Sequence, residues 1–119
     1  DESYNANPAS MAAALTVLGA MPGRRLALLG DMRELGEQSA ALHAGIAAPL
    51  AAAGVAEVAL VGPEIAVLEH DGATRLADAA AALAWARATL QPGDVLLVKG
   101  SNGVGLGRVV AGLQQEQAA

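Results

Sequence analysis

The stretch RRLALLG at residues 24–30 is a short apolar run enclosed by glycines, and it decides the fold class. A run of this length between turn residues predicts a strand that is buried on both faces. Two further runs have the same pattern, AEVALVG at residues 56–62 and DVLLVKG at residues 94–100. Continuous apolar strands are typical of parallel sheets, because helices cover both faces of such sheets.

Helical patterns separate these strands. The run at residues 8–21 has Pro8 at a first helical position and Asn7 before it as the predicted N-cap. We also expect a helix over residues 37–54 that Pro49 kinks or shortens, a short helix over 63–70, a short strand over 73–77, a helix over 78–90 capped by Asp78, and a last helix after the glycines at 103–107. The alternation predicts one α/β domain over residues 1–119, with a mostly parallel, Rossmann-like sheet flanked by helices on both faces.

Composition limits the core and the function classes. Aromatic residues make up 2% of the 119 residues and Phe is absent, so Leu, Val, Ile, Met and Ala must form the core. The predicted core strands carry Leu26, Leu28, Leu29, Val58, Leu60, Val95, Leu97 and Val98. Trp85 is expected to pack on its helix. The net charge is −5 and the seven cationic residues are scattered, which argues against a nucleic-acid surface.

The same composition gives expectations for location. No apolar run approaches the roughly 20 residues that span a bilayer, so we expect no membrane segment. The chain has no cysteine, which fits a reducing cytoplasm and excludes thiolate chemistry. His43 and His70 are far apart in sequence, and helix-surface or capping roles are favoured for them over metal ligation.

Ligands of parallel sheets bind beyond the carboxyl ends of the strands, so the residues that follow each strand are site candidates. Asp31 follows the first strand, and Lys99, Gly100 and Ser101 close the third. Lys99 is the only lysine in the chain, and it is a candidate for meeting an anion with backbone amides beside it. The alternative is that Lys99 only snorkels at the strand end, with its aliphatic stem on the protein and its ammonium in water.

The glycine run that follows does not match a phosphate-binding motif. Gly103, Gly105 and Gly107 read G-x-G-x-G instead of the dinucleotide spacing G-x-G-x-x-G. A Walker A loop is also absent, because Gly100 follows the lysine where Ser or Thr is required. An oxidoreductase that uses this glycine loop is therefore disfavoured.

Three separated motifs resemble one protein family. DESYNANPASMAAAL at residues 1–15, LALLGDMRELGEQSAALH at 26–43 and GDVLLVKGSNGVGLGRVV at 93–110 resemble the carboxyl-terminal domain of the Mur ligases. Within the family the chain is most similar to the ligases that add D-alanyl-D-alanine. The resemblance covers nearly the whole chain, although residues 62–78 match only in outline. Asn102 stands where family members commonly have arginine.

The resemblance implies a part of an ATP-dependent amide ligase of peptidoglycan synthesis. Family members have an amino-terminal domain and a central ATPase domain that this chain lacks. The central domain binds ATP and Mg²⁺ and forms an acyl phosphate on UDP-N-acetylmuramoyl-tripeptide, which the amine of D-alanyl-D-alanine attacks. The carboxyl-terminal domain closes over the nucleotide and the dipeptide. A cytoplasmic monomer is expected, and no catalytic or metal-binding residue is expected in this chain.

The resemblance also assigns candidate binding residues. Asp1, Tyr4, Asn5 and Asn7 are expected to meet the nucleotide, although Tyr4 has the alternative of covering the sheet edge and Asn7 that of only capping the first helix. Asp31 is expected to attract the ammonium group of the dipeptide, and Lys99, Gly100 and Ser101 to meet a carboxylate or phosphate. The competing interpretation is a stand-alone, non-catalytic α/β binding module.

We predict that the isolated chain folds and is inert toward ATP. It has a full alternation of strands and helices, but it has no phosphate-binding loop. The test is a phosphate-release assay on the purified chain, with circular dichroism as the control for folding. ATP turnover above background in the absence of any other domain would contradict the prediction.

Overall fold

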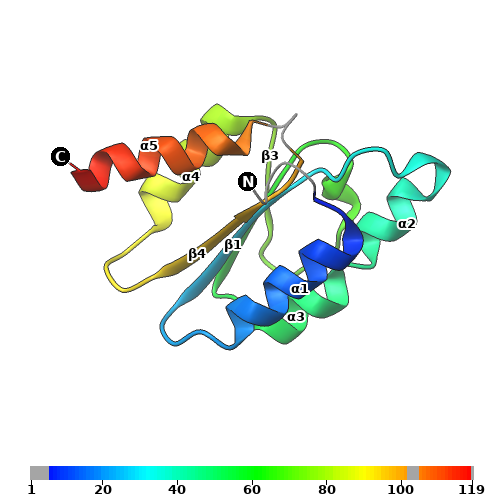
Figure 1. Ribbon diagram of the computed structural model, residues 1–119, viewed down its shortest axis with the longest axis horizontal. Coiled ribbons are helices and arrows are strands. Elements are labelled where there is room, and N and C mark those ends of the chain that lie inside the picture. Colours follow the sequence, from blue (N-terminus) through cyan, green and yellow to red (C-terminus); the bar gives the residue numbers. More distant parts are fainter. Residues whose placement is uncertain (1–5, 102–104, 119) are drawn as a thin grey trace.

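The computed structural model describes residues 6–101 and 105–118. In these residues, a four-stranded parallel sheet has the order β3-β2-β1-β4 (Figure 1). The strands are β1 (Arg25–Gly30), β2 (Glu57–Val61), β3 (Thr74–Leu76) and β4 (Val95–Lys99). The α/β prediction is therefore confirmed, including the short third strand.

Helices cover both faces of the sheet. The helices α1 (Pro8–Gly19), α2 (Ser39–Ala44) and α3 (Ala47–Ala53) lie on one side, and α4 (Ala79–Thr89) and α5 (Leu106–Ala118) lie on the other (Figure 1). Side chains of each strand alternate between two core clusters. Ala27 and Leu29 of β1 belong to the cluster under α1 and α3, whereas Leu28 packs with Ala82 and Ala86 of α4. Trp85 is half-buried in the second cluster, which confirms its packing role.

Two helix starts follow the sequence prediction closely. Asn7 is the N-cap of α1: its carboxamide oxygen accepts from the Ser10 N–H at 2.8 Å, and the Ser10 hydroxyl accepts from the Asn7 N–H at 3.0 Å. Asp78 caps α4 in a similar way by accepting from the Ala81 N–H at 2.9 Å. Such side chains satisfy N–H groups of the first helical turn that have no partner within the helix.

The helix predicted over residues 37–54 is interrupted, as expected from Pro49, but the interruption begins earlier than predicted. A single 3₁₀ turn, η2 (Gly36–Gln38), precedes α2, and the chain breaks again at Gly45 before α3 begins. Pro49 causes this break one turn before its own position, because its ring would clash with the carbonyl of Gly45 in a continuous helix. Within α3 the proline lies in the first turn, where an N–H has no helical partner. The short helix predicted over residues 63–70 is also only a 3₁₀ turn, η3 (Ile65–Val67).

The predicted core is fully buried in two strands and only partly buried in the third. Leu26, Leu28 and Leu29 of β1 are 0% exposed, and Val58 and Leu60 of β2 are 2% and 0% exposed. Val95, Leu97 and Val98 of β4 are half-buried, because β4 pairs only with β1 and forms an edge of the described sheet. The expectation of adjacent strands covered on both faces is confirmed, since β4 packs against both core clusters, but its burial is less complete.

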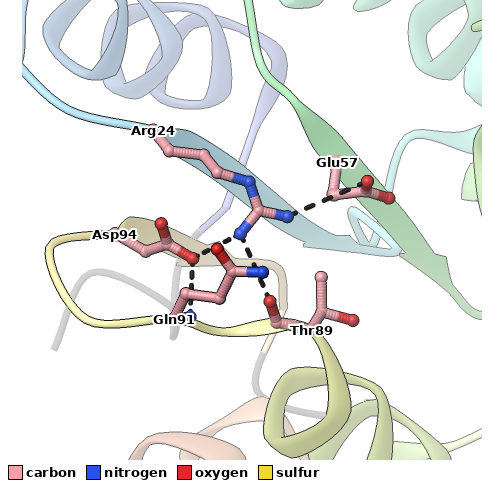
Figure 2. Close-up of polar contacts among 5 residues, drawn as sticks. All are labelled: Arg24, Glu57, Thr89, Gln91 and Asp94. Carbon is pink, nitrogen blue, oxygen red and sulfur yellow. Dashed lines mark hydrogen bonds and ion pairs between the residues drawn. The ribbon is translucent and has the colours of Figure 1, made fainter.

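Arg24 links neighbouring strands at the amino end of the sheet through hydrogen bonds and an ion pair (Figure 2). The Arg24 guanidinium, just before β1, lies 2.6 Å from a carboxylate oxygen of Asp94 and also donates to the Thr89 carbonyl at 3.3 Å. The same Asp94 oxygen accepts from the Gln91 N–H at 2.8 Å. Glu57, at the start of β2, lies farther away at 3.9 Å. Because the Asp94 side chain is only 4% exposed, its charge needs these donors, and they tie the start of β1 to the turn before β4.

We predict a graded response to truncation of the strand core. Leu29→Ala in the central strand should lower the free energy of unfolding by about 2–5 kcal/mol, the usual cost of a cavity at a fully buried leucine. Leu97→Ala on the edge strand should cost about 1–2 kcal/mol, since its side chain already meets water. Urea unfolding of the two variants measures this difference. Equal costs would contradict the assignment of β4 to the edge.

Candidate functional site

The loops that follow β1, β2 and β4 meet at the carboxyl edge of the sheet. The ends of β1 and β4 approach each other closely at Gly30 and Gly100. A Cβ atom on Gly100 would lie 2.8 Å from the Cα atom of Gly30 and 2.9 Å from the Leu106 side chain. Only glycine fits at position 100, and this close packing brings the residues after β4 against those after β1.

Asp31 joins all three loops. Its backbone N–H donates to the Val61 carbonyl at 3.3 Å, and its carbonyl accepts from the Ser101 N–H at 2.8 Å. One carboxylate oxygen accepts from the N–H groups of Glu64 at 3.0 Å and Ile65 at 2.7 Å, and these bonds hold the start of the η3 turn. The residue is 6% exposed. A carboxylate bound by two peptide N–H groups is fixed in place, while its charge still acts on the space beside it.

Gly62 is part of this arrangement, and the sequence analysis missed it. Its φ is +118°, and a Cβ atom at this position would lie 2.5 Å from the nearest carboxylate oxygen of Asp31. The available signal was a glycine directly after β2, at the edge where ligands of parallel sheets bind.

Lys99 and Ser101 are both buried, at 4% exposed each. The Ser101 hydroxyl accepts from the Arg33 N–H at 3.0 Å, so this serine holds the loop after β1. Lys99 lies in register with Leu29 of β1. Snorkelling would place the lysine ammonium in water, and this alternative does not fit so low an exposure.

His43 is 0% exposed, so the helix-surface or capping role predicted for it is wrong. Its Nε2 atom accepts from the Met32 N–H at 2.9 Å, and its Nδ1 atom lies 2.8 Å from the Ser39 carbonyl. The loop after β1 folds back over α2 and buries the ring, which helix periodicity alone could not reveal. The second histidine, His70, is half-buried in the loop before β3.

An acidic cavity of about 620 Å³ opens at the carboxyl ends of β1, β2 and β3. Its charged lining residues are Asp31, Arg33, Glu34, Glu64 and Asp78. Four acidic residues and one arginine therefore line the cavity, a balance that favours a cationic group. Glu34 has a φ of +62°, a left-handed conformation that is uncommon for a residue other than glycine.

The structure separates the predicted substrate residues into two places. Asp31 lines the acidic cavity, whereas Lys99, Gly100 and Ser101 lie on the β4 side and do not line it. Asn7 is exposed at the start of α1, and its carboxamide oxygen is used in the cap. Asp1, Tyr4 and Asn5 lie outside the described residues, as does Asn102.

Among the side chains that the structure describes, at residues 6–101 and 105–114, no three of His, Cys, Asp or Glu are grouped so that they could hold a metal ion. Over residues 6–101 and 105–118, every helix is too short or too polar to cross a membrane.

Comparisons with known proteins agree with one another. The profile of a protein family described as "Mur ligase, glutamate ligase domain" matches residues 2–102. A UDP-N-acetylmuramoyl-tripeptide--D-alanyl-D-alanine ligase from Synechocystis is 41% identical over 98% of this chain and 27% of its own length. The Escherichia coli ligase of the same name is 37% identical over 97% of this chain and 26% of its own length.

Solved structures give the same similarity. A MurF ligase from Thermotoga maritima in complex with ADP superimposes with a TM-score of 0.84 and 27% identity, covering 100% of this chain and 29% of that one. A MurF from Acinetobacter baumannii gives a TM-score of 0.84 and 30% identity over 97% of this chain and 27% of that one. The chain thus spans between a quarter and a third of the length of the relatives it matches.

We predict that Gly62→Ala is destabilising because of Asp31. The new methyl group would collide with the carboxylate in a left-handed backbone conformation, at a cost of about 2 kcal/mol or more. Gly93→Ala is the matched control: its φ is +88°, and nothing lies within 4 Å of its Cβ position, so it meets backbone strain alone.

Denaturant midpoints of the two variants measure the difference. In an Asp31→Ala background, Gly62→Ala should cost less than in the native sequence, because the colliding carboxylate is gone. Equal costs for Gly62→Ala and Gly93→Ala would show that the approach to Asp31 is unimportant.

Proposed function

Since the chain belongs to the Mur ligase family, as its glutamate ligase domain, we propose that it is the carboxyl-terminal domain of an ATP-dependent amide ligase. The proposed reaction adds D-alanyl-D-alanine to UDP-N-acetylmuramoyl-tripeptide in peptidoglycan synthesis. The similarity to ligases named for this reaction extends over nearly the whole chain and supports this choice within the family. The chain covers about a quarter of these relatives, so we propose that other domains of the full-length ligase bind ATP and use it to form the acyl phosphate.

The observation that carries the proposal is the convergence of the loops after β1, β2 and β4 at one edge. Asp31, Ser101 and Lys99 all come from the motifs shared with the family, and hydrogen bonds from Asp31 unite their loops. In a parallel sheet this edge is the place where a ligand binds. We propose that it faces the central domain when the full-length ligase closes over its substrates.

The charges at this edge suit the two ends of a dipeptide. We propose that the acidic cavity lined by Asp31, Glu34, Glu64 and Asp78 attracts the ammonium group of D-alanyl-D-alanine. Asp31 would act through its charge, because one of its oxygens already accepts two peptide N–H groups. Lys99, Gly100 and Ser101 would meet a carboxylate or phosphate on the β4 side.

The nucleotide is proposed to lie near the start of α1. Asp1, Tyr4, Asn5 and Asn7 would contact its base and ribose, and one structural relative was solved in complex with ADP. We propose that Mg²⁺ is held together with ATP by other domains of the full-length ligase. Use of ATP supports a cytoplasmic location for the ligase, and we propose that it works as a monomer.

The test is Lys99→Ala in the full-length ligase. If the ammonium meets an anionic group of a substrate, the loss is a charge-assisted hydrogen bond worth roughly 1.5–3 kcal/mol. We therefore expect kcat/KM to fall about ten- to a hundredfold, with partial recovery in Lys99→Arg, because a planar guanidinium does not replace a compact ammonium. Steady-state kinetics with ATP and dipeptide varied separately identifies the substrate concerned.

A control is needed because Lys99 is buried and also takes part in an interaction within the chain. Lys99→Met keeps most of the side-chain volume and removes the charge together with its N–H donors. Thermal unfolding of each variant separates loss of binding from loss of fold. Unchanged kcat/KM for both substrates in folded variants would remove Lys99 from the proposed site.

A further inference from the structure

We propose that His43 is a positioning residue that fixes the loop after β1 and thereby the acidic side of the site. The effect of His43 on the acidic side of the site rests on the proposed function. Its effect on the conformation of the loop does not depend on that proposal. His43 lies on α2, away from the cavity lining, and it acts through the backbone of Met32.

The hydrogen bonds define the form of the imidazole. A backbone N–H can only donate, so Nε2 must be the unprotonated nitrogen that accepts from Met32. Nδ1 then carries the proton and donates to the Ser39 carbonyl at 2.8 Å. Both ring nitrogens of the buried His43 therefore form hydrogen bonds: Nε2 accepts from the loop after β1, and Nδ1 donates to a carbonyl of its own helix.

The bond to Met32 completes a series of bonds along the loop. The backbone N–H groups of Asp31, Met32 and Arg33 donate in turn to the Val61 carbonyl, the His43 ring and the Ser101 hydroxyl. Three successive residues are thereby tied to β2, α2 and the end of β4. His43 supplies the only bond of this series that comes from the α2 side.

The residue after this series is the one that needs such support. Glu34 lines the acidic cavity with a φ of +62°, and an unfavourable conformation of this kind persists only where the surroundings impose it. The α2 helix also contacts the cavity wall directly, since the Ser39 hydroxyl donates to the Glu64 carboxylate at 2.6 Å. Freeing Met32 from His43 should release the Glu34 carboxylate from its place in the cavity.

Three variants of the full-length ligase test this role. His43→Leu removes the acceptor for Met32 and keeps an apolar side chain in the core. His43→Gln places an amide oxygen near the position of Nε2 and can still accept from Met32. His70→Leu is the matched control, because it makes the same chemical change at the half-buried histidine outside this network.

Two measurements are made on each variant. Hydrogen exchange followed by mass spectrometry compares peptides from the loop at residues 31–36 with peptides from β2. In His43→Leu we expect loop exchange to rise about tenfold or more while β2 stays protected, because one buried hydrogen bond is lost locally. In kinetics, we expect kcat/KM for the dipeptide to fall about tenfold, mainly through a higher KM. His43→Gln should recover most of both effects, and His70→Leu should match the native ligase.

The outcomes separate the two proposals. Faster exchange spread equally over the loop and β2, or His43→Gln behaving like His43→Leu, would overturn the positioning role and leave His43 as a packing residue. Faster loop exchange with unchanged dipeptide kinetics would overturn the link to the site. If His43→Leu does not fold, failure of His43→Gln to restore native exchange and KM overturns the proposal. A native ligase that does not add the dipeptide contradicts the proposed function alone, because the exchange data still decide the role of the loop bond.

Discussion

The hydrogen bonds of Asp31 are the interaction on which the carboxyl edge depends. Its backbone binds the ends of β2 and β4, and its carboxylate binds the η3 turn. Without these bonds the loops after β1, β2 and β4 would be separate surface segments of low local stability. Together with the close packing of Gly30 and Gly100, they make one rigid surface from residues that are far apart in sequence.

The two ends of the sheet serve different purposes. At the amino end, Arg24 and Asp94 form a partly buried ion pair that joins β1 to the turn before β4 (Figure 2). At the carboxyl end, buried polar side chains bind backbone groups of loops and leave charged groups around a cavity. The amino end therefore fixes the strands, and the carboxyl end is the edge that we propose for ligand binding.

The sequence predicted those features that depend on neighbouring residues. The apolar runs of β1 and β2, the Asn7 and Asp78 caps and the residues at strand ends were all readable from local patterns. Features that depend on distant contacts were not. The burial of His43 requires the loop of residues 31–35 to fold over α2, and the need for glycine at position 62 comes from Asp31 in the loop after β1. The position of β4 at the edge is likewise set by the strand order and not by its composition.

The placement of Trp85 determines what optical spectroscopy can observe in this domain. It is the only tryptophan in the chain, and it lies half-buried in the layer of α4 and α5. Its intrinsic emission therefore monitors that layer, whereas α1, α2 and α3 on the opposite face carry no indole. An unfolding curve followed by Trp85 emission therefore does not detect early local unfolding around His43. A fluorophore introduced on α2 would report on the unfolding of the opposite face of the sheet.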